Sequence, residues 1–202
     1  MILKQTSLND EIRKQLMGLS RDDFSEVYLF FDYDAHQTNL GKDVQEDVIC
    51  EMLESFDNET ENGKLYISYP MVEALRDYEP GKCGNGVDCF VAIKELDNYK
   101  NASAVRAYNP HFKEYDIDAW KDIIDVFVMK VSCLCETPDT MEYEQYSGKV
   151  TPSEIYVMEK KKAERQRVFV LSAFPEFLLD YFGVKLWRTS VKHRRNLTCK
   201  CV

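Results

Sequence analysis

The chain has 202 residues, of which 45% are hydrophobic, and a formal net charge of −9, so it suits one domain with a substantial core rather than two. Its 12 tyrosines and 11 phenylalanines exclude a disordered protein, whose composition would lack aromatics. The negative charge argues against a generic nucleic-acid coat protein, but not against an enzyme that reaches phosphate through divalent cations.

Helical and strand patterns alternate in the first part of the chain. Ser7 is the predicted N-cap of a first helix that ends near Gly18. The run 27–31, VYLFF, is apolar without alternation, which is typical of a strand buried on both faces. Residues 43–56 have the apolar spacing of an amphipathic helix, and residues 64–69 form a second strand candidate. A strand, a helix and a strand in this order predict a parallel pair.

The rest of the chain is mainly helical in its pattern. We expect a short helix at 71–75, a loop at 79–90, mostly helical structure over 91–135, a helix starting at Thr151-Pro152-Ser153-Glu154, a third buried strand at 168–174 and a helix at 175–182 ended by Gly183. The predicted fold class is therefore α/β, with helices covering a small, mainly parallel sheet.

Two carboxylates, Asp32 and Asp34, come directly after the first predicted strand in the sequence VYLFFDYDAH. They would point the same way if the strand continued through them. Such a pair is costly unless a cation compensates its charge, and Mg²⁺ prefers carboxylate oxygens. Ligands of parallel sheets gather at the carboxyl ends of strands, where Glu73 could supply a third oxygen. His36 could contact phosphate or transfer a proton.

Each of these residues also has an ordinary structural interpretation. An Asp-x-Asp sequence is often a solvated turn or a helix cap. Glu73 could be a common first-turn helix acid, since acids favour helix N-termini. His36 could be a loop histidine without a catalytic role.

The stretches VYLFFDYDAH, DVQEDVICEMLESF and KLYISYPMVEAL together resemble the Toprim fold, in particular the Toprim-like nucleases of bacterial phage defence that are related to overcoming-lysogenization-defect proteins. The resemblance covers roughly residues 26–78 and extends to VFVLSAFPEFLLDYFG. It implies a compact α/β domain in which Asp32 and Asp34 bind Mg²⁺, or Mn²⁺, for phosphodiester cleavage. It also implies that Glu73 is a further metal ligand and catalytic candidate.

The chain length predicts a single α/β domain, 1–202, into which the resemblance places the Toprim-like part. A Toprim-like core is expected at about 24–78 plus 165–184, a helical insertion at about 91–165 and a basic C-terminal tail at about 185–202. Toprim enzymes also carry a glutamate on an earlier β-α element, which has no counterpart before Asp32. A catalytically degenerate Toprim-like interaction subunit is therefore an alternative, with Tyr143 and Tyr146 as interface candidates.

Haloacid-dehalogenase phosphatases are a second family with Asp-x-Asp after an apolar strand. There Asp32 would be the nucleophile and Asp34 the acid/base, and Ser68 or Ser172 could supply a strand-end hydroxyl. The position two residues after Asp34 is His36 instead of threonine or valine, and no paired-acid motif follows downstream, which weighs against this alternative.

Charge and cysteine usage indicate partners and compartment. Basic residues gather after position 160, which favours a phosphate-facing surface or a solvated tail: Lys160, Lys161, Lys162, Arg165, Arg167, Arg188, Lys192, His193, Arg194 and Arg195. We expect nucleic acid as the partner, bound through its backbone, together with a protein partner or a second copy that supplies or regulates activity, and no membrane. Seven cysteines without secretory features predict thiols in a cytoplasmic protein, and the resemblance to phage-defence nucleases implies a bacterial one.

Overall fold

The computed structural model describes residues 17–33, 42–80, 89–107, 111–135, 141–163 and 166–191. The first predicted helix lies outside these ranges except for a turn at Met17 and Gly18. A single 3-10 turn, η1 (Arg21–Asp23), precedes the first strand. The described structure around the predicted Asp32 site therefore begins with this turn.

A three-stranded sheet forms the centre of the N-terminal half. Its elements are β1 (Tyr28–Asp32), α2 (Lys42–Ser55), β2 (Asp57–Asn58) and β3 (Gly63–Ser68). The strand order is β1-β3-β2. β1 and β3 run parallel, with Asp32 opposite Ser68, and β2 pairs antiparallel with the start of β3. The predicted strand–helix–strand unit and its parallel pair are thus confirmed.

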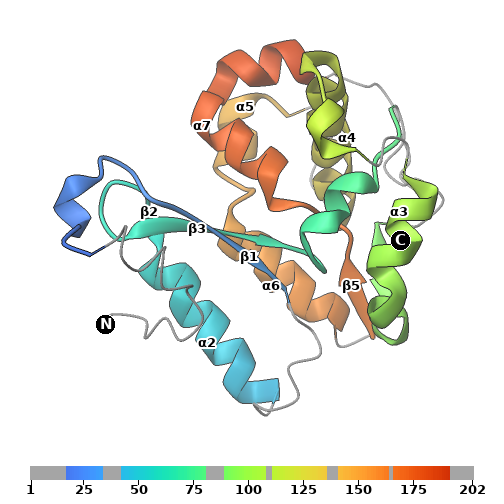
Figure 1. The fold of residues 1–202 in the computed structure, drawn as a ribbon, viewed down its shortest axis with the longest axis horizontal. Coiled ribbons are helices and arrows are strands. Elements are labelled where there is room, and N and C mark those ends of the chain that lie inside the picture. Colours follow the sequence, from blue (N-terminus) through green and yellow to red (C-terminus); the bar gives the residue numbers. More distant parts are fainter. Residues whose placement is uncertain are drawn as a thin grey trace.

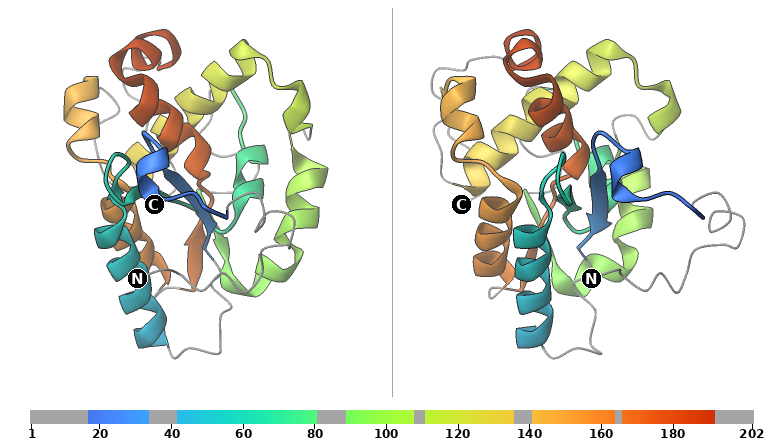
Figure 2. Two further views of the ribbon diagram at one scale, coloured as in Figure 1. Left: turned by 60° about the vertical axis from the view of Figure 1, so that its left-hand side comes forward. Right: turned by 90° about the vertical axis from the view of Figure 1, so that its left-hand side faces the viewer.

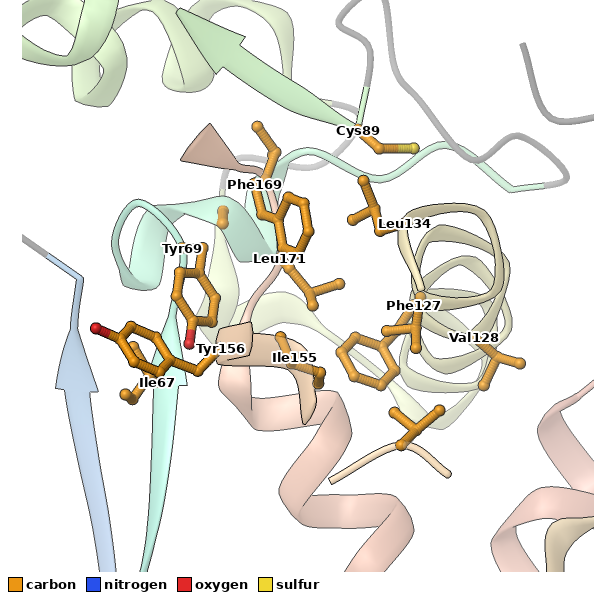
Figure 3. Close-up of a cluster of buried hydrophobic side chains, with 14 of the residues drawn as sticks. Ile67, Tyr69, Cys89, Phe127, Val128, Leu134, Ile155, Tyr156, Phe169 and Leu171 are labelled. Carbon is orange, nitrogen blue, oxygen red and sulfur yellow. The ribbon is translucent and has the colours of Figure 1, made fainter. Parts of the chain in front are cut away.

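Helices cover both faces of this sheet (Figure 1). Side chains alternate along β3, so Tyr66 packs against Phe177 of α7 (Ala173–Ser190). Ile67 belongs to the buried cluster that includes Tyr156 of α6 (Pro152–Ala163) (Figure 3). Figure 2 shows α2 and α6 side by side beneath the sheet. This layering confirms the α/β class.

A second, antiparallel pair joins distant parts of the chain. β4 (Phe90–Ala92) pairs with β5 (Arg167–Phe169). Beyond β5, Leu171 and Tyr69 exchange two backbone hydrogen bonds of 2.7 and 2.8 Å, which links this pair to the end of β3. Among the described strands, only β1 and β3 are parallel. The sheets are therefore mixed, where the sequence predicted a mainly parallel arrangement.

The third predicted strand, 168–174, is shorter than expected. β5 ends at Phe169, and the Ser172 hydroxyl accepts a hydrogen bond from the Phe174 backbone as the N-cap of α7. The helix also continues past Gly183, which has a left-handed φ of 58°, to Ser190. Gly183 interrupts the helix as predicted, because a glycine tolerates this conformation, but a further helical segment follows it directly.

The middle of the chain is mainly helical, as predicted. Its elements are η2 (Val72–Arg76), η3 (Ile93–Asn98), α3 (Tyr99–Arg106), η4 (Phe112–Glu114), α4 (Ile117–Leu134) and α5 (Tyr143–Ser147). The Asp116 carboxylate caps α4 by accepting hydrogen bonds from two backbone N–H groups. Phe127 and Leu134 of α4 enter the core beside Ile155 and Phe169 (Figure 3). This shared core joins the middle of the chain to the sheet.

Two chain-wide expectations can be compared with the described residues. None of the helices in these ranges combines the length and the apolar character that crossing a membrane requires. Cys133 takes part in a disulfide, so the prediction that all seven cysteines are thiols is wrong. Cys50, Cys89 and Cys135 are present as thiols.

Candidate functional site at the ends of β1 and β3

Asp32 is the last residue of β1 and lies at the exposed end of that strand. Its Oδ1 accepts a hydrogen bond of 2.7 Å from the backbone N–H of Val72, which follows β3 by four residues. Because β1 and β3 are parallel, their carboxyl ends meet at one edge of the sheet. The Asp32 carboxylate is therefore held against the segment that leads from β3 into η2.

Glu73, the second predicted ligand, is the next residue along this segment. It is buried, with 7% of the residue exposed, in the first turn of η2. Its Oε1 lies 2.9 Å from the ammonium of Lys100 in α3, a side chain that is itself 68% exposed. The structure thus brings a solvated cation onto a buried carboxylate next to Asp32.

The two carboxyl groups influence each other electrostatically. Partial desolvation raises the pKa of Asp32, and the charge of Glu73 adds to this rise, while the Val72 hydrogen bond and the Lys100 charge oppose it. Burial would also raise the pKa of Glu73, but the hydrogen bond and charge of Lys100, with a backbone hydrogen bond and Arg76, lower it. The neighbouring negative charges of Asp32 and Glu73 favour a cation beside them, and the ammonium group of Lys100 is such a cation.

The donor set suits a hard divalent ion. Asp32 and Glu73 offer carboxylate oxygens, which Mg²⁺ and Mn²⁺ prefer, and Mg²⁺ commonly takes one or two carboxylates while keeping several waters. Within the described ranges, no group of three or more histidine, cysteine, aspartate or glutamate side chains is arranged to hold a metal.

Two of the predicted site residues cannot be compared with the structure. Asp34 and His36 lie outside the described residues. Their predicted roles, Asp34 as a metal ligand and His36 in phosphate contact or proton transfer, stay predictions. Of the four site residues expected from the sequence, Asp32 and Glu73 are those that the structure brings together.

The serines of the phosphatase alternative have structural roles. The Ser68 Oγ accepts a hydrogen bond of 3.2 Å from the backbone N–H of Ala173. Ser172 is the N-cap of α7, and both serines are buried. A strand-end hydroxyl that acts on phosphate must be accessible, so these contacts do not favour the phosphatase.

Of the two predicted interface tyrosines, Tyr146 is buried and is therefore wrong as a surface anchor, whereas the role of Tyr143 stays a prediction. Residues 143–147 form α5, and Tyr146 is 4% exposed, packed against the ring of Trp187 at 4.7 Å. The half-buried Tyr143 donates a hydrogen bond to the Leu179 carbonyl. Both tyrosines attach α5 to α7, because an amphipathic short helix buries its aromatic side even in an acidic segment.

The predicted basic surface is described only in part. Arg188 of α7, Lys161 of α6 and Arg167 of β5 are exposed, and the Arg167 guanidinium also lies 4.2 Å from the ring centre of Phe90. Lys192, His193, Arg194 and Arg195 lie outside the described residues.

Sequence reasoning missed Lys100 and the backbone of Val72. Lys100 stands in the pattern NYKNAS of a polar helix, where nothing local distinguishes it from a solvated lysine. A buried glutamate needs a partner, so the strand-end position of Glu73 was the one available signal that a basic side chain must approach it.

Comparisons with protein-family models, with curated proteins and with solved structures gave no match to this chain.

Proposed function

We propose that this protein is a metal-dependent nuclease of Toprim type, which cleaves phosphodiester bonds with Mg²⁺ or Mn²⁺ and serves in bacterial phage defence. The observation that supports it most is the meeting of Asp32 and Glu73 at the carboxyl edge of a parallel strand pair. The resemblance in sequence implies metal binding by Asp32 and Asp34, with Glu73 as a further ligand.

In this proposal Asp32 and Glu73 hold the ion, with Asp34 as a further ligand. When bound, the ion would activate water and stabilise charge on the non-bridging phosphate oxygens. The Val72 N–H orients the Asp32 carboxylate by its hydrogen bond. Lys100 is exposed enough to leave Glu73 and contact a substrate phosphate, so the cation that balances Glu73 in the free protein would act on the nucleic-acid backbone.

A cleavage assay tests the proposal. Labelled single-stranded DNA, double-stranded DNA and RNA are incubated with the protein and with Mg²⁺, Mn²⁺ or a chelator. We expect metal-dependent cleavage that Asp32→Asn abolishes. Asp118→Asn is the matched control, because Asp118 is an exposed aspartate on α4 paired with Lys121. Cleavage that Asp32→Asn leaves unchanged would contradict the proposed site.

A second candidate is the catalytically degenerate interaction subunit, which a different observation favours. Aromatic side chains of β1 and α7 form a cluster on one face of the sheet, in which the Phe30 ring stacks on Phe174 at 4.9 Å. Phe30, Tyr181 and Phe182 are exposed by 39%, 54% and 52%. Exposed aromatic groups are frequent anchors of protein interfaces. A wild-type protein that cleaves none of the three substrates would favour this subunit.

A further inference from the structure

A cavity of about 280 Å³ lies beside β3, on the side of β2 and away from β1. Residues of β3, α5 and α7 line it, as does the turn that leads into α6. Its volume lies just below the ~300–1,000 Å³ that is typical of small-molecule pockets. Asp32 and Glu73 are absent from its described lining, so the cavity is separate from the strand-end site.

Two buried polar atoms of this lining lack a partner. Glu176 of α7 is 7% exposed and Tyr146 of α5 is 4% exposed. The Glu176 Oε1 and the Tyr146 hydroxyl find no hydrogen-bond partner among the described residues. An unsatisfied buried polar group costs about 1–3 kcal/mol, and here a carboxyl and a hydroxyl from two helices share one cavity.

The charged side chains that line the cavity determine which ligand charge it favours. Its described lining contains three acids, Asp57, Glu176 and Asp180, and one base, Lys64. Lys64 is paired with Asp180, which also accepts a hydrogen bond from the Tyr66 hydroxyl. Asp180 is thus compensated while Glu176 is not. Phosphates and carboxylates would be repelled, and a cation would be attracted.

The apolar part of the lining indicates the body of the ligand. Leu53, Phe56, Leu65 and Val150 line the cavity together with the rings of Tyr66 and Tyr143. Flat apolar groups pack well against such walls, and aromatic faces attract cations. The cavity is too small for a nucleotide with its phosphates and matches a single ring that carries a short charged arm.

We propose that this cavity binds a compact organic cation, a protonated amine or amidinium on a flat apolar body, whose charge lies against the Glu176 side chain and beside Tyr146.

Release of a proton from Glu176 on binding is an expected consequence of this proposal and provides a readout. Burial, with the charge of Asp180, raises the pKa of Glu176 to about 8, against the opposing charge of Lys64. The nearby Tyr66, Tyr69 and Tyr146 have pKa values raised by burial and stay neutral. A bound cation stabilises the carboxylate, so the neutral Glu176 carboxyl releases its proton to the buffer as the cation binds.

Titration calorimetry with three one-ring probes tests the proposal at pH 7. Benzylamine carries the cation, benzyl alcohol is its neutral counterpart and benzoate its anionic one. We expect benzylamine to bind at least about ten-fold more tightly than benzyl alcohol, and benzoate to show no binding. The heat of benzylamine binding should change with the ionisation enthalpy of the buffer, which reports the released proton.

Variants place the cation at Glu176. Glu176→Gln should weaken benzylamine binding by about ten-fold or more and abolish the buffer dependence, whereas Glu144→Gln, on the exposed side of α5, should change neither. Circular dichroism checks the fold of each variant. If Glu176→Gln does not fold, Tyr146→Phe takes its place, with a several-fold weaker affinity expected.

Three results would overturn the proposal. The first is that none of the probes binds at up to about 10 mM. The second is that benzoate binds as tightly as benzylamine. The third is that the folded variant, Glu176→Gln or its replacement Tyr146→Phe, keeps the wild-type affinity for benzylamine.

Discussion

Glu73 and Glu176 each expose 7% of the residue, but the Glu176 carboxyl lies deeper in the protein, and the pKa values of the two carboxyl groups shift in opposite directions. Lys100 contacts Glu73 at 2.9 Å and lowers its pKa against the effect of burial. Glu176 faces Lys64 as well, but that lysine is paired with Asp180, and burial raises the pKa of Glu176 to about 8. A buried carboxyl stays ionised where a cation is dedicated to it.

The opposite pKa shifts suggest different uses for the strand end that holds Glu73 and the cavity that holds Glu176. Glu73 is an ionised carboxylate at an open strand end, beside Asp32, where a hard cation and a phosphate could both reach it. Glu176 is a mostly neutral carboxyl in a partly open cavity lined by tyrosines, where an organic cation would supply the missing charge. The predictions below change one region at a time.

The largest effect is expected on the proposed cleavage activity at the strand end. Glu73→Gln removes one ligand charge while it keeps the shape of the side chain, so we expect metal-dependent cleavage to slow by about 100-fold or more. Single-turnover cleavage of labelled DNA or RNA measures this. The control is Glu95→Gln, an exposed acid of η3, which should leave the rate unchanged. A Glu73→Gln enzyme with the wild-type rate would remove Glu73 from the site.

The next effect concerns the dependence of stability on pH at Glu176. Its pKa of about 8 in the folded protein lies above the 4.5 of a free glutamate, so the folded state keeps a proton that the unfolded state loses. Stability therefore falls as pH rises from about 4.5 to about 8 and levels off outside this window. The glutamine of Glu176→Gln cannot titrate. As the pH rises from about 4.5 to about 8, the stability of this variant relative to wild type should therefore rise, by about 1.4 kcal/mol for each unit between the folded and unfolded pKa values of Glu176.

Urea unfolding at pH 5 and pH 9 measures this change. Glu159 has the same raised pKa, about 8, mainly because of burial, so wild type and variant both keep its contribution and it cancels in the comparison. A stability difference that is the same at both pH values would mean that Glu176 is ionised throughout.

The smallest effect is expected from the ammonium of Lys100. Lys100→Met leaves the buried Glu73 without its cation, and we expect unfolding free energy at pH 7 to fall by about 1–2 kcal/mol, a range reduced for the exposure of Lys100. Lys100 lowers the pKa of Glu73 in the folded state. The stability that the Lys100–Glu73 pair contributes is therefore fully present above the ordinary pKa of a glutamate, and it is lost as the pH falls through the lowered pKa of Glu73.

The matched control is Lys121→Met, which removes a lysine from the exposed pair with Asp118. Chemical unfolding at pH 7 and at about pH 3 compares the two variants. If Lys100→Met were no more destabilising than Lys121→Met at pH 7, the contrast between Glu73 and Glu176 would not depend on Lys100.

Sequence patterns predicted the elements that depend on local chemistry. The apolar run before Asp32 and the helical spacing of residues 43–56 located β1 and α2 to within a residue or two. These patterns could not predict the pairing of β5, because the apolar sequence VFVLSAF is compatible with a parallel or an antiparallel neighbouring strand. Its early end reflects the Ser172 cap, which competes with the strand for the same residues.

Of the two candidate sites, the strand end follows from local sequence patterns, whereas the cavity does not. Asp32 and Glu73 could be proposed because strand ends are local features that topology brings together. Glu176 looks like an ordinary polar position of the helix AFPEFLLDYFG, and its cavity forms only where α5, α7 and β3 meet. Long-range packing of this kind leaves no periodic signal in the sequence.

Metal binding at the strand end tests the central claim most directly. Mn²⁺ and Mg²⁺ are titrated by calorimetry into wild type and into the double variant Asp32→Asn/Glu73→Gln, with chain integrity checked by circular dichroism. We predict saturable binding of a divalent ion by wild type that the double variant loses. Wild-type protein without metal-dependent heat, or a folded double variant that binds as wild type does, would contradict the assignment of Asp32 and Glu73 as a cation site.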